Sequence, residues 1–110
     1  MELLQELEIF AKEYDVPIVE EEVRDCLAMF LRIQQPKRLL ELGTAIGYSA
    51  IFFATLLPEV EIITIERDDA MAFKAKENIK KAGLTERITL LHGDAKELLP
   101  TLDGFFDAIF

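Results

Sequence analysis

One stretch of sequence decides the fold of this chain: RLLELGTAIGYS, at residues 38–49. Its first five residues form a short, mostly apolar run between Pro36 and Gly43, which predicts a buried strand. Residues 48–57 are apolar almost without a break and end at Pro58, which predicts a buried helix. The stretch is therefore typical of a strand, a glycine turn and a helix, the opening unit of a parallel sheet.

The remaining residues continue this alternation in both directions. Apolar residues at helical spacing predict an amphipathic helix at residues 2–14 and a second apolar stripe from Val23 to Ile33, on which Cys26 is expected to be a core residue. After the opening unit, the patterns predict a strand at 60–65, a helix at 68–82, a strand at 88–91, a helix at 95–99 and the start of a strand at 106–110.

This order predicts an α/β protein with a Rossmann-like, doubly wound parallel sheet, preceded by two helices. We expect residues 1–36 to form a helical segment that packs on the site, and residues 37–110 to form the sheet. Because the chain stops inside an apolar strand, we expect it to be the N-terminal half of a truncated domain.

Composition limits the class of protein. The 110 residues are 51% hydrophobic, which is enough for a core, and no apolar run is long enough to span a membrane. The N-terminus lacks the basic start of a signal peptide, and a single cysteine cannot form an internal disulfide, so we expect a cytoplasmic protein. The net charge of −9 disfavours this chain as the main contact surface for nucleic acid, although an RNA substrate stays open.

The glycine turn indicates a ligand site. A strand, a glycine turn and a helix place backbone N–H groups and a positive helix end in one crevice. A dinucleotide prefers three glycines there, but Ala45 stands between Gly43 and Gly47. S-adenosylmethionine places an amino-acid end in the same crevice, and Glu41 offers a carboxylate for its ammonium group. The residues thus favour adenosylmethionine over a dinucleotide.

The next two strand ends carry matching signals. Glu66 ends the second strand, where a carboxylate accepts hydrogen bonds from ribose hydroxyls. Gly93 follows the third strand and lets the backbone pass close to a planar base. Asp94 can accept a hydrogen bond from the amine of adenine, and it can also cap the helix that begins at Ala95. His92 has no evident Ser or Cys partner, so we expect it to be a packing or hydrogen-bonding residue.

With these residues in place, the chain resembles the cation-dependent O-methyltransferases of the catechol and caffeoyl-CoA type. The resemblance rests on LLELGTAIGYSA (39–50), ITIER (63–67), GDA (93–95) and FDAIF (106–110). The segment YDVPIV (14–19) is similar to the bacterial branch that includes a transfer-RNA 5-hydroxyuridine methyltransferase.

The residues and the resemblance together assign cofactor contacts to Val19, Glu41, Gly43, Ser49, Glu66, Arg67, Gly93, Asp94 and Ala95. The resemblance implies that Val19 contacts the methionine end through its backbone, that Ser49 binds the carboxylate and that Arg67 flanks the adenine. It also implies a divalent cation, usually magnesium, held by two Asp and one Asn that lie beyond residue 110. Asp107 lies at the start of its strand and is not expected to be one of these ligands.

The expected function is methyl transfer from S-adenosylmethionine to a hydroxyl of a catechol-like small molecule or of 5-hydroxyuridine in tRNA. Two alternatives stay open: a SAM-binding module that has lost catalysis, and an NAD-dependent dehydrogenase on a similar fold. The apolar N-terminal helix offers a surface for a homodimer.

Overall fold

The computed structural model describes residues 2–110, so Met1 of the expected N-terminal segment lies outside the described residues. The elements in chain order are α1 (Glu2–Glu13), α2 (Glu21–Gln34), β1 (Arg38–Leu42), α3 (Tyr48–Leu56), β2 (Glu61–Glu66), α4 (Asp69–Lys81), β3 (Ile88–His92), α5 (Ala95–Leu98), the 3-10 turn η1 (Leu99–Thr101) and β4 (Ala108–Ile109). The order and type of these elements confirm the α/β prediction. None of the helices in residues 2–110 combines the length and the apolar content that crossing a bilayer requires.

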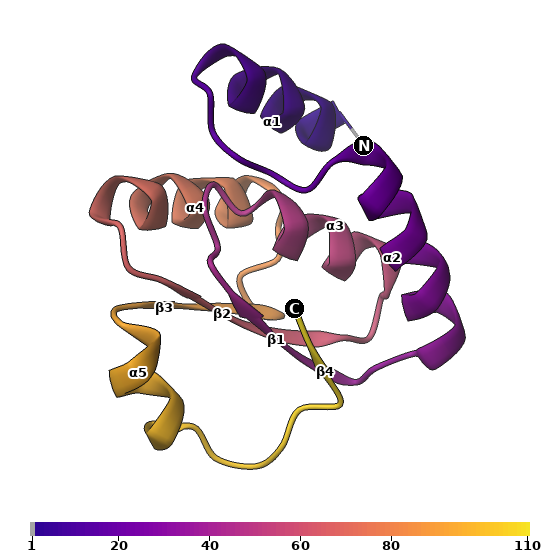
Figure 1. Ribbon diagram of the computed structural model, residues 1–110, viewed down its shortest axis with the longest axis vertical. Helices are drawn as coiled ribbons and strands as arrows, with labels where there is room; N and C mark the ends of the chain where they lie inside the picture. Colours follow the sequence, from indigo (N-terminus) through magenta and orange to yellow (C-terminus); the bar gives the residue numbers. More distant parts are fainter. Residues whose placement is uncertain (1) are drawn as a thin grey trace.

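The four strands form one parallel sheet in the order β3-β2-β1-β4 (Figure 1). The chain moves outward from β1 to β2 and β3, and then crosses back to add β4 on the other side of β1. The strand order therefore reverses between β1 and β4. In open α/β sheets, ligands bind outside the carboxyl ends of the strands at this kind of position.

Helices cover both faces of the sheet, as expected of a doubly wound fold. Figure 1 shows α3 and α4 on one face, with α1 and α2 on the same side, and α5 on the other. Side chains alternate between the faces, so Leu39 and Ile62 join the core under the larger helices. Leu40 and Ile63 point the opposite way and pack with Leu98 of α5.

Two predictions about local structure were wrong. Cys26 is exposed rather than in the core, because α2 packs inward through Leu27, Ala28 and Leu31 and turns the Cys26 side of the helix to the surface. The last strand covers only Ala108–Ile109 instead of residues 106–110.

The shortened start of β4 follows from the chemistry of Asp107. Its carboxylate accepts hydrogen bonds from the backbone N–H groups of Lys37, at 2.9 Å, and Arg38, at 2.8 Å. These bonds lower the pKa of Asp107. Asp107 therefore joins β1 and β4 at their amino ends.

Candidate functional site

A cavity of about 250 Å³ lies at the carboxyl end of β1. Its lining comes from five parts of the chain: the loop residues Pro17, Ile18 and Val19, the strand residue Glu41, the turn Gly43–Ala45, Tyr48 and Ser49 at the start of α3, and Phe110. The structure thus places four of the expected cofactor contacts around one cavity: Val19, Glu41, Gly43 and Ser49.

The glycine turn adopts left-handed backbone conformations at three residues. Gly43 has φ 91°, Ala45 has φ 49° and Gly47 has φ 90°. A Cβ on Gly43 would meet nothing within 4 Å, so this residue is required for its conformation and leaves the backbone open to a ligand. Gly47 is the N-cap residue of α3 and offers no capping side chain, and the first turn of α3 contains no acidic residue. The backbone N–H groups in the first turn of α3 are therefore available to an external carboxylate.

Glu41 is the main charged group of the cavity. Its side chain is only 1% exposed and accepts a hydrogen bond of 2.6 Å from the hydroxyl of Thr64. Burial raises the pKa of Glu41 to about 7; the hydrogen bond from Thr64 lowers it in part, and the nearby charge of Glu66 raises it further. A cation entering the cavity would therefore meet a carboxyl group that ionises near neutral pH.

Thr64 and Thr44 are site residues that the sequence reasoning missed. Their hydroxyl oxygens lie 2.6 Å apart, and both side chains are buried. Because Thr64 donates its hydroxyl proton to the Glu41 carboxylate, Thr44 is the donor to Thr64. The one available signal was a threonine inside the isoleucine-rich strand β2, in register with Glu41 on β1.

Glu66 holds the glycine turn against the end of β2. Its Oε1 accepts a hydrogen bond of 2.8 Å from the backbone N–H of Ala45, and its Oε2 accepts one of 2.9 Å from the N–H of Asp68. The first bond accompanies the left-handed conformation of Ala45. Each carboxylate oxygen keeps a second acceptor position, so these contacts leave room for ribose hydroxyls.

The third strand end lies next to Glu66. The backbone N–H of Gly93 donates to the carbonyl oxygen of Glu66 at 2.9 Å. Asp94 caps α5, since its Oδ1 accepts a hydrogen bond of 2.8 Å from the N–H of Lys96. Ala95 is half-buried and Arg67 is exposed. The capping prediction for Asp94 is confirmed, and its second oxygen stays free of that bond.

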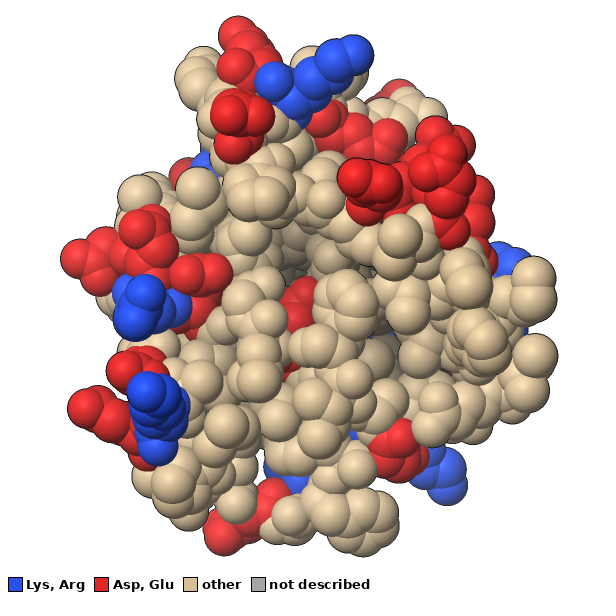
Figure 2. Space-filling view, in the orientation of Figure 1, with Lys and Arg blue, Asp and Glu red and all other residues tan. Residues whose placement is uncertain are grey.

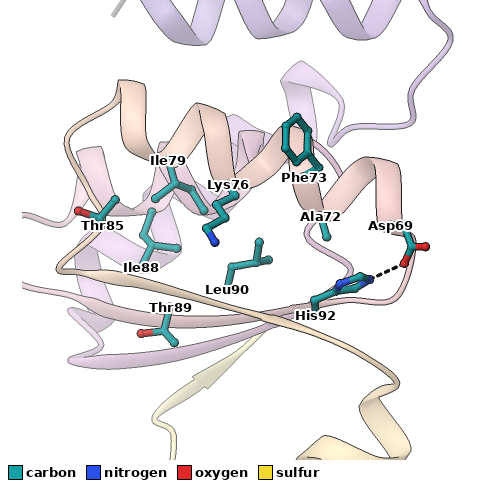
Figure 3. A pocket seen from close by; sticks show the side chains of 10 residues that line it. All are labelled: Asp69, Ala72, Phe73, Lys76, Ile79, Thr85, Ile88, Thr89, Leu90 and His92. Atoms are coloured by element: carbon teal, nitrogen blue, oxygen red, sulfur yellow. Dashed lines mark ion pairs between the residues drawn. The ribbon is translucent and has the colours of Figure 1, made fainter.

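His92 belongs to a different hollow, of about 580 Å³, between α4 and the free edge of β3. Figure 3 shows its ring reaching Asp69, with Nε2 2.8 Å from Oδ1. The other labelled side chains of this hollow include no Ser or Cys (Figure 3), so the expectation of a hydrogen-bonding histidine is met. Within residues 2–110, no three His, Cys, Asp or Glu side chains are grouped to hold a metal ion.

The chemistry of the cavity matches an α-amino acid. The buried carboxyl group of Glu41 suits an ammonium group, and the uncapped start of α3 suits a carboxylate. Glu66 and Gly93 lie at the neighbouring strand ends, where the N–H of Gly93 bonds the carbonyl oxygen of Glu66 and the Glu66 carboxylate bonds the glycine turn.

Comparisons with known proteins agree with this geometry. A family model described as O-methyltransferase matches residues 1–110. The chain is 42% identical over 89 residues to a catechol O-methyltransferase of Niastella koreensis, an alignment that covers 76% of this chain and 40% of that protein.

Solved structures show the same fold. The O-methyltransferase TomG of Streptomyces achromogenes, in complex with SAM, has a TM-score of 0.86 and 32% identity, covering all of this chain and 52% of that one. The SAH-bound methyltransferase PaMTH1 of Podospora anserina has a TM-score of 0.90 and 30% identity, covering all of this chain and 49% of that one. The chain therefore spans about half the length of these structures. By sequence and by fold, it belongs to the O-methyltransferase family.

Proposed function

We propose that this chain binds S-adenosylmethionine and forms the cofactor half of an O-methyltransferase. One observation carries the proposal: the buried carboxyl group of Glu41 faces a cavity that also opens on the uncapped start of α3. The Glu41 carboxylate suits the ammonium group of the methionine end and would repel a phosphate. The start of α3 suits the carboxylate of the methionine end. It argues against a dinucleotide, and family membership supports the same choice.

In this proposal the contacts follow the cofactor from end to end. Glu41 binds the ammonium group, and Ser49 and the N–H groups of α3 bind the carboxylate, close to Gly43. Val19 belongs to the N-terminal segment, residues 1–36, and covers the cavity of the half-domain formed by residues 37–110. Glu66 binds the ribose, while the remaining assigned residues surround the adenine: Arg67, Gly93, Asp94 and Ala95.

The proposed reaction is in-line transfer of the sulfonium methyl group to a hydroxyl oxygen. This chain contributes cofactor capture and orientation, which bring the methyl group to a fixed place in the crevice. The family resemblance also implies a divalent cation in the intact protein. Within residues 2–110, no three His, Cys, Asp or Glu side chains are grouped to hold one.

For the acceptor we propose a catechol-like small molecule rather than 5-hydroxyuridine in tRNA. The chain carries 21 acidic and 12 basic residues. On the face shown in Figure 2, Lys and Arg form small separate groups beside acidic side chains. A phosphate backbone would find no continuous basic surface there. Incubating the intact protein and magnesium with labelled cofactor, and with either a catechol or bulk tRNA, tests the choice: label in tRNA alone would overturn it.

Cofactor binding is tested by calorimetry on the intact protein with adenosylhomocysteine. Glu66→Ala removes the ribose acceptor and the bond to Ala45, and we expect affinity to fall at least about tenfold, as for a lost charge-assisted hydrogen bond. Glu61→Ala is the matched control, because Glu61 lies at the other end of β2, where its side chain forms an ion pair with Arg38 at 3.6 Å.

Two results would contradict the cofactor assignment: no binding by the wild-type protein, or equal binding by the Glu66→Ala variant. A protein that binds adenosylhomocysteine but methylates no hydroxyl would instead be a non-catalytic cofactor-binding module. A fluorescence change of NADH on titration would revive the dehydrogenase hypothesis.

We further propose that the protein works in the cytoplasm and forms a homodimer, through α2 rather than through the N-terminal helix α1 that the sequence suggested. The outer side of α2 carries exposed apolar residues: Val23, Met29, Phe30 and Ile33. The helix has acidic residues in its first turn and Arg32 in its last, so two antiparallel copies would place opposite charges together. The exposed, unpaired thiol of Cys26 on the same surface suits a reducing compartment.

A further inference from the structure

The loop between α1 and α2, residues 15–20, forms a strap over the cofactor cavity. Pro17, Ile18 and Val19 line that cavity on one side and a second hollow of about 560 Å³ on the other. Among the described residues, no hydrogen bond joins these three to the glycine turn. The strap packs against the core through Val16, Ile18 and Val19, and side chains of the flanking helices fix its two ends.

Three side chains tie those ends together, and we call them the clasp: Glu8 of α1, Arg24 of α2 and Tyr48 of α3. The Tyr48 hydroxyl donates to Glu8 Oε2 at 2.6 Å. Arg24 Nη1 donates to the same carboxylate oxygen at 3.2 Å and to the Tyr48 oxygen at 3.0 Å. One phenol oxygen thereby links the helix before the strap, the helix after it and the helix that starts at the glycine turn.

The surroundings make this link well defined. Tyr48 is only 2% exposed, so its ring is held by packing. Burial, together with the hydrogen bond to Glu8, raises the pKa of Tyr48, which keeps the hydroxyl protonated and able to donate. Arg24 also lies 3.2 Å from Asp25 and 3.7 Å from Glu21, and its guanidinium is thereby oriented by carboxylates on α1 and α2.

Tyr48 connects the clasp directly to the cavity. It is the first residue of α3, it lines the cavity and it precedes Ser49. A shift of the strap relative to α3 would move Val19 relative to Ser49 and Glu41, which lie around the same space. The clasp is placed to hold this separation constant.

We propose that the clasp sets the position of the strap over the amino-acid end of the cofactor, with Tyr48 as its central positioning residue. This inference rests on the proposed cofactor site and adds to it a device that the three-dimensional arrangement alone creates. The clasp acts through Val19 and its neighbours, because the Tyr48 hydroxyl is bonded to Glu8 and Arg24.

The test compares two ligands that differ only at the end the strap covers. Adenosylhomocysteine has the amino-acid end, whereas methylthioadenosine keeps the adenine, ribose and sulfur but lacks it. In the intact protein, Tyr48→Phe removes one hydroxyl and leaves the buried ring. We expect it to weaken adenosylhomocysteine about tenfold in calorimetry, as for one hydrogen bond to a charged group, and to leave methylthioadenosine unchanged.

Two further variants sharpen the result. Tyr14→Phe makes the same chemical change at the other tyrosine and should leave both affinities unchanged. Glu8→Gln keeps the shape of the acceptor but removes its charge, and it should give the same selective loss. Because the clasp acts as a unit, the Tyr48→Phe/Glu8→Gln double variant should lose no more than the larger single loss.

The outcomes separate the clasp from the cofactor site itself. If the wild-type protein binds neither ligand, the proposed function fails and the clasp fails with it. If the wild-type protein binds both and Tyr48→Phe binds them equally well, the clasp alone is overturned. An equal loss for both ligands overturns it too, because that pattern indicates general damage to the fold. Should Tyr48→Phe not fold, the selective loss must appear in Glu8→Gln.

Discussion

At the scale of single residues, Glu41 connects stability to ligand binding. Its pKa rises from 4.5 to about 7 on folding, mainly because of burial. The folded state therefore holds more protons than the unfolded state between these two values, and the ligand-free protein loses stability as the pH rises through this window. Above pH 7, the ionised Glu41 lowers the free energy of unfolding by up to about 3 kcal/mol, because each pKa unit between 4.5 and 7 corresponds to about 1.36 kcal/mol.

Glu41→Gln should remove that cost, because glutamine resembles the protonated acid and keeps an acceptor for Thr64. In urea unfolding without ligand, we expect the variant to exceed the wild type by up to about 3 kcal/mol at pH 8 and to match it near pH 4.5. A wild-type protein that is more stable than the variant at pH 8 would contradict this expectation.

The affinity for the ligand should increase with pH, whereas stability decreases, because both depend on the protonation of Glu41. A ligand ammonium prefers the ionised form of Glu41, so affinity for adenosylhomocysteine should fall about tenfold between pH 8 and pH 6, as a group with a pKa near 7 takes up its proton. Calorimetry in two buffers of different ionisation enthalpy should detect proton release near pH 6.5. Glu41→Gln should bind weakly with little change over this range, and a flat profile in the wild type would refute the linkage.

At the scale of elements, the glycine turn depends on backbone conformation more than on side chains. Gly43 has φ 91° and open space around its Cβ position, so Gly43→Ala should cost about 1 to 2 kcal/mol for conformation alone. Ala45 already holds φ 49°, and Ala45→Gly relieves that strain but adds freedom to the unfolded chain.

We therefore expect the two substitutions to differ in urea unfolding. Ala45→Gly should stay within about 1 kcal/mol of the wild type, while Gly43→Ala is clearly destabilised. Equal destabilisation by both would show that the turn is held by something other than its left-handed residues.

At the scale of the whole molecule, the proposed homodimer depends on the outer side of α2. Ile33 is 77% exposed and lies in the last turn of α2. In an antiparallel pair, Ile33→Glu would remove apolar contact and place a new charge near the acidic start of the partner helix. We expect sedimentation velocity of the intact protein to show a wild-type dimer and a largely monomeric variant.

Ile9→Glu is the matched control for this prediction, because Ile9 is 67% exposed and lies on α1, outside the proposed α2 interface. It should sediment like the wild type. A wild-type protein that stays monomeric across a concentration series, or an Ile33→Glu variant that dimerises equally well, would rule out the α2 interface.

Much of the fold and part of the site could be predicted from sequence because they depend on local patterns. Apolar runs, Pro36 and the glycines mark the strands and helices, and parallel strand order places Glu41, Glu66 and Asp94 along one edge. The same patterns could not show which side of α2 faces the core. Cys26 and Phe30 look as apolar as Leu27 and Leu31, and only the packing of α2 separates them.

The sequence by itself determined the α/β alternation, the glycine turn and the acids at its strand ends, since each follows from residues close together in the chain. The tertiary structure decided which distant groups meet. Thr64 donates to Glu41 across 23 residues, and Tyr48 reaches Glu8 across 40. Such pairs leave no periodic signal, because their distance depends on how whole helices and strands pack. The glycine turn is encoded locally, whereas the cavity and the proposed clasp depend on contacts that exist only in the folded chain.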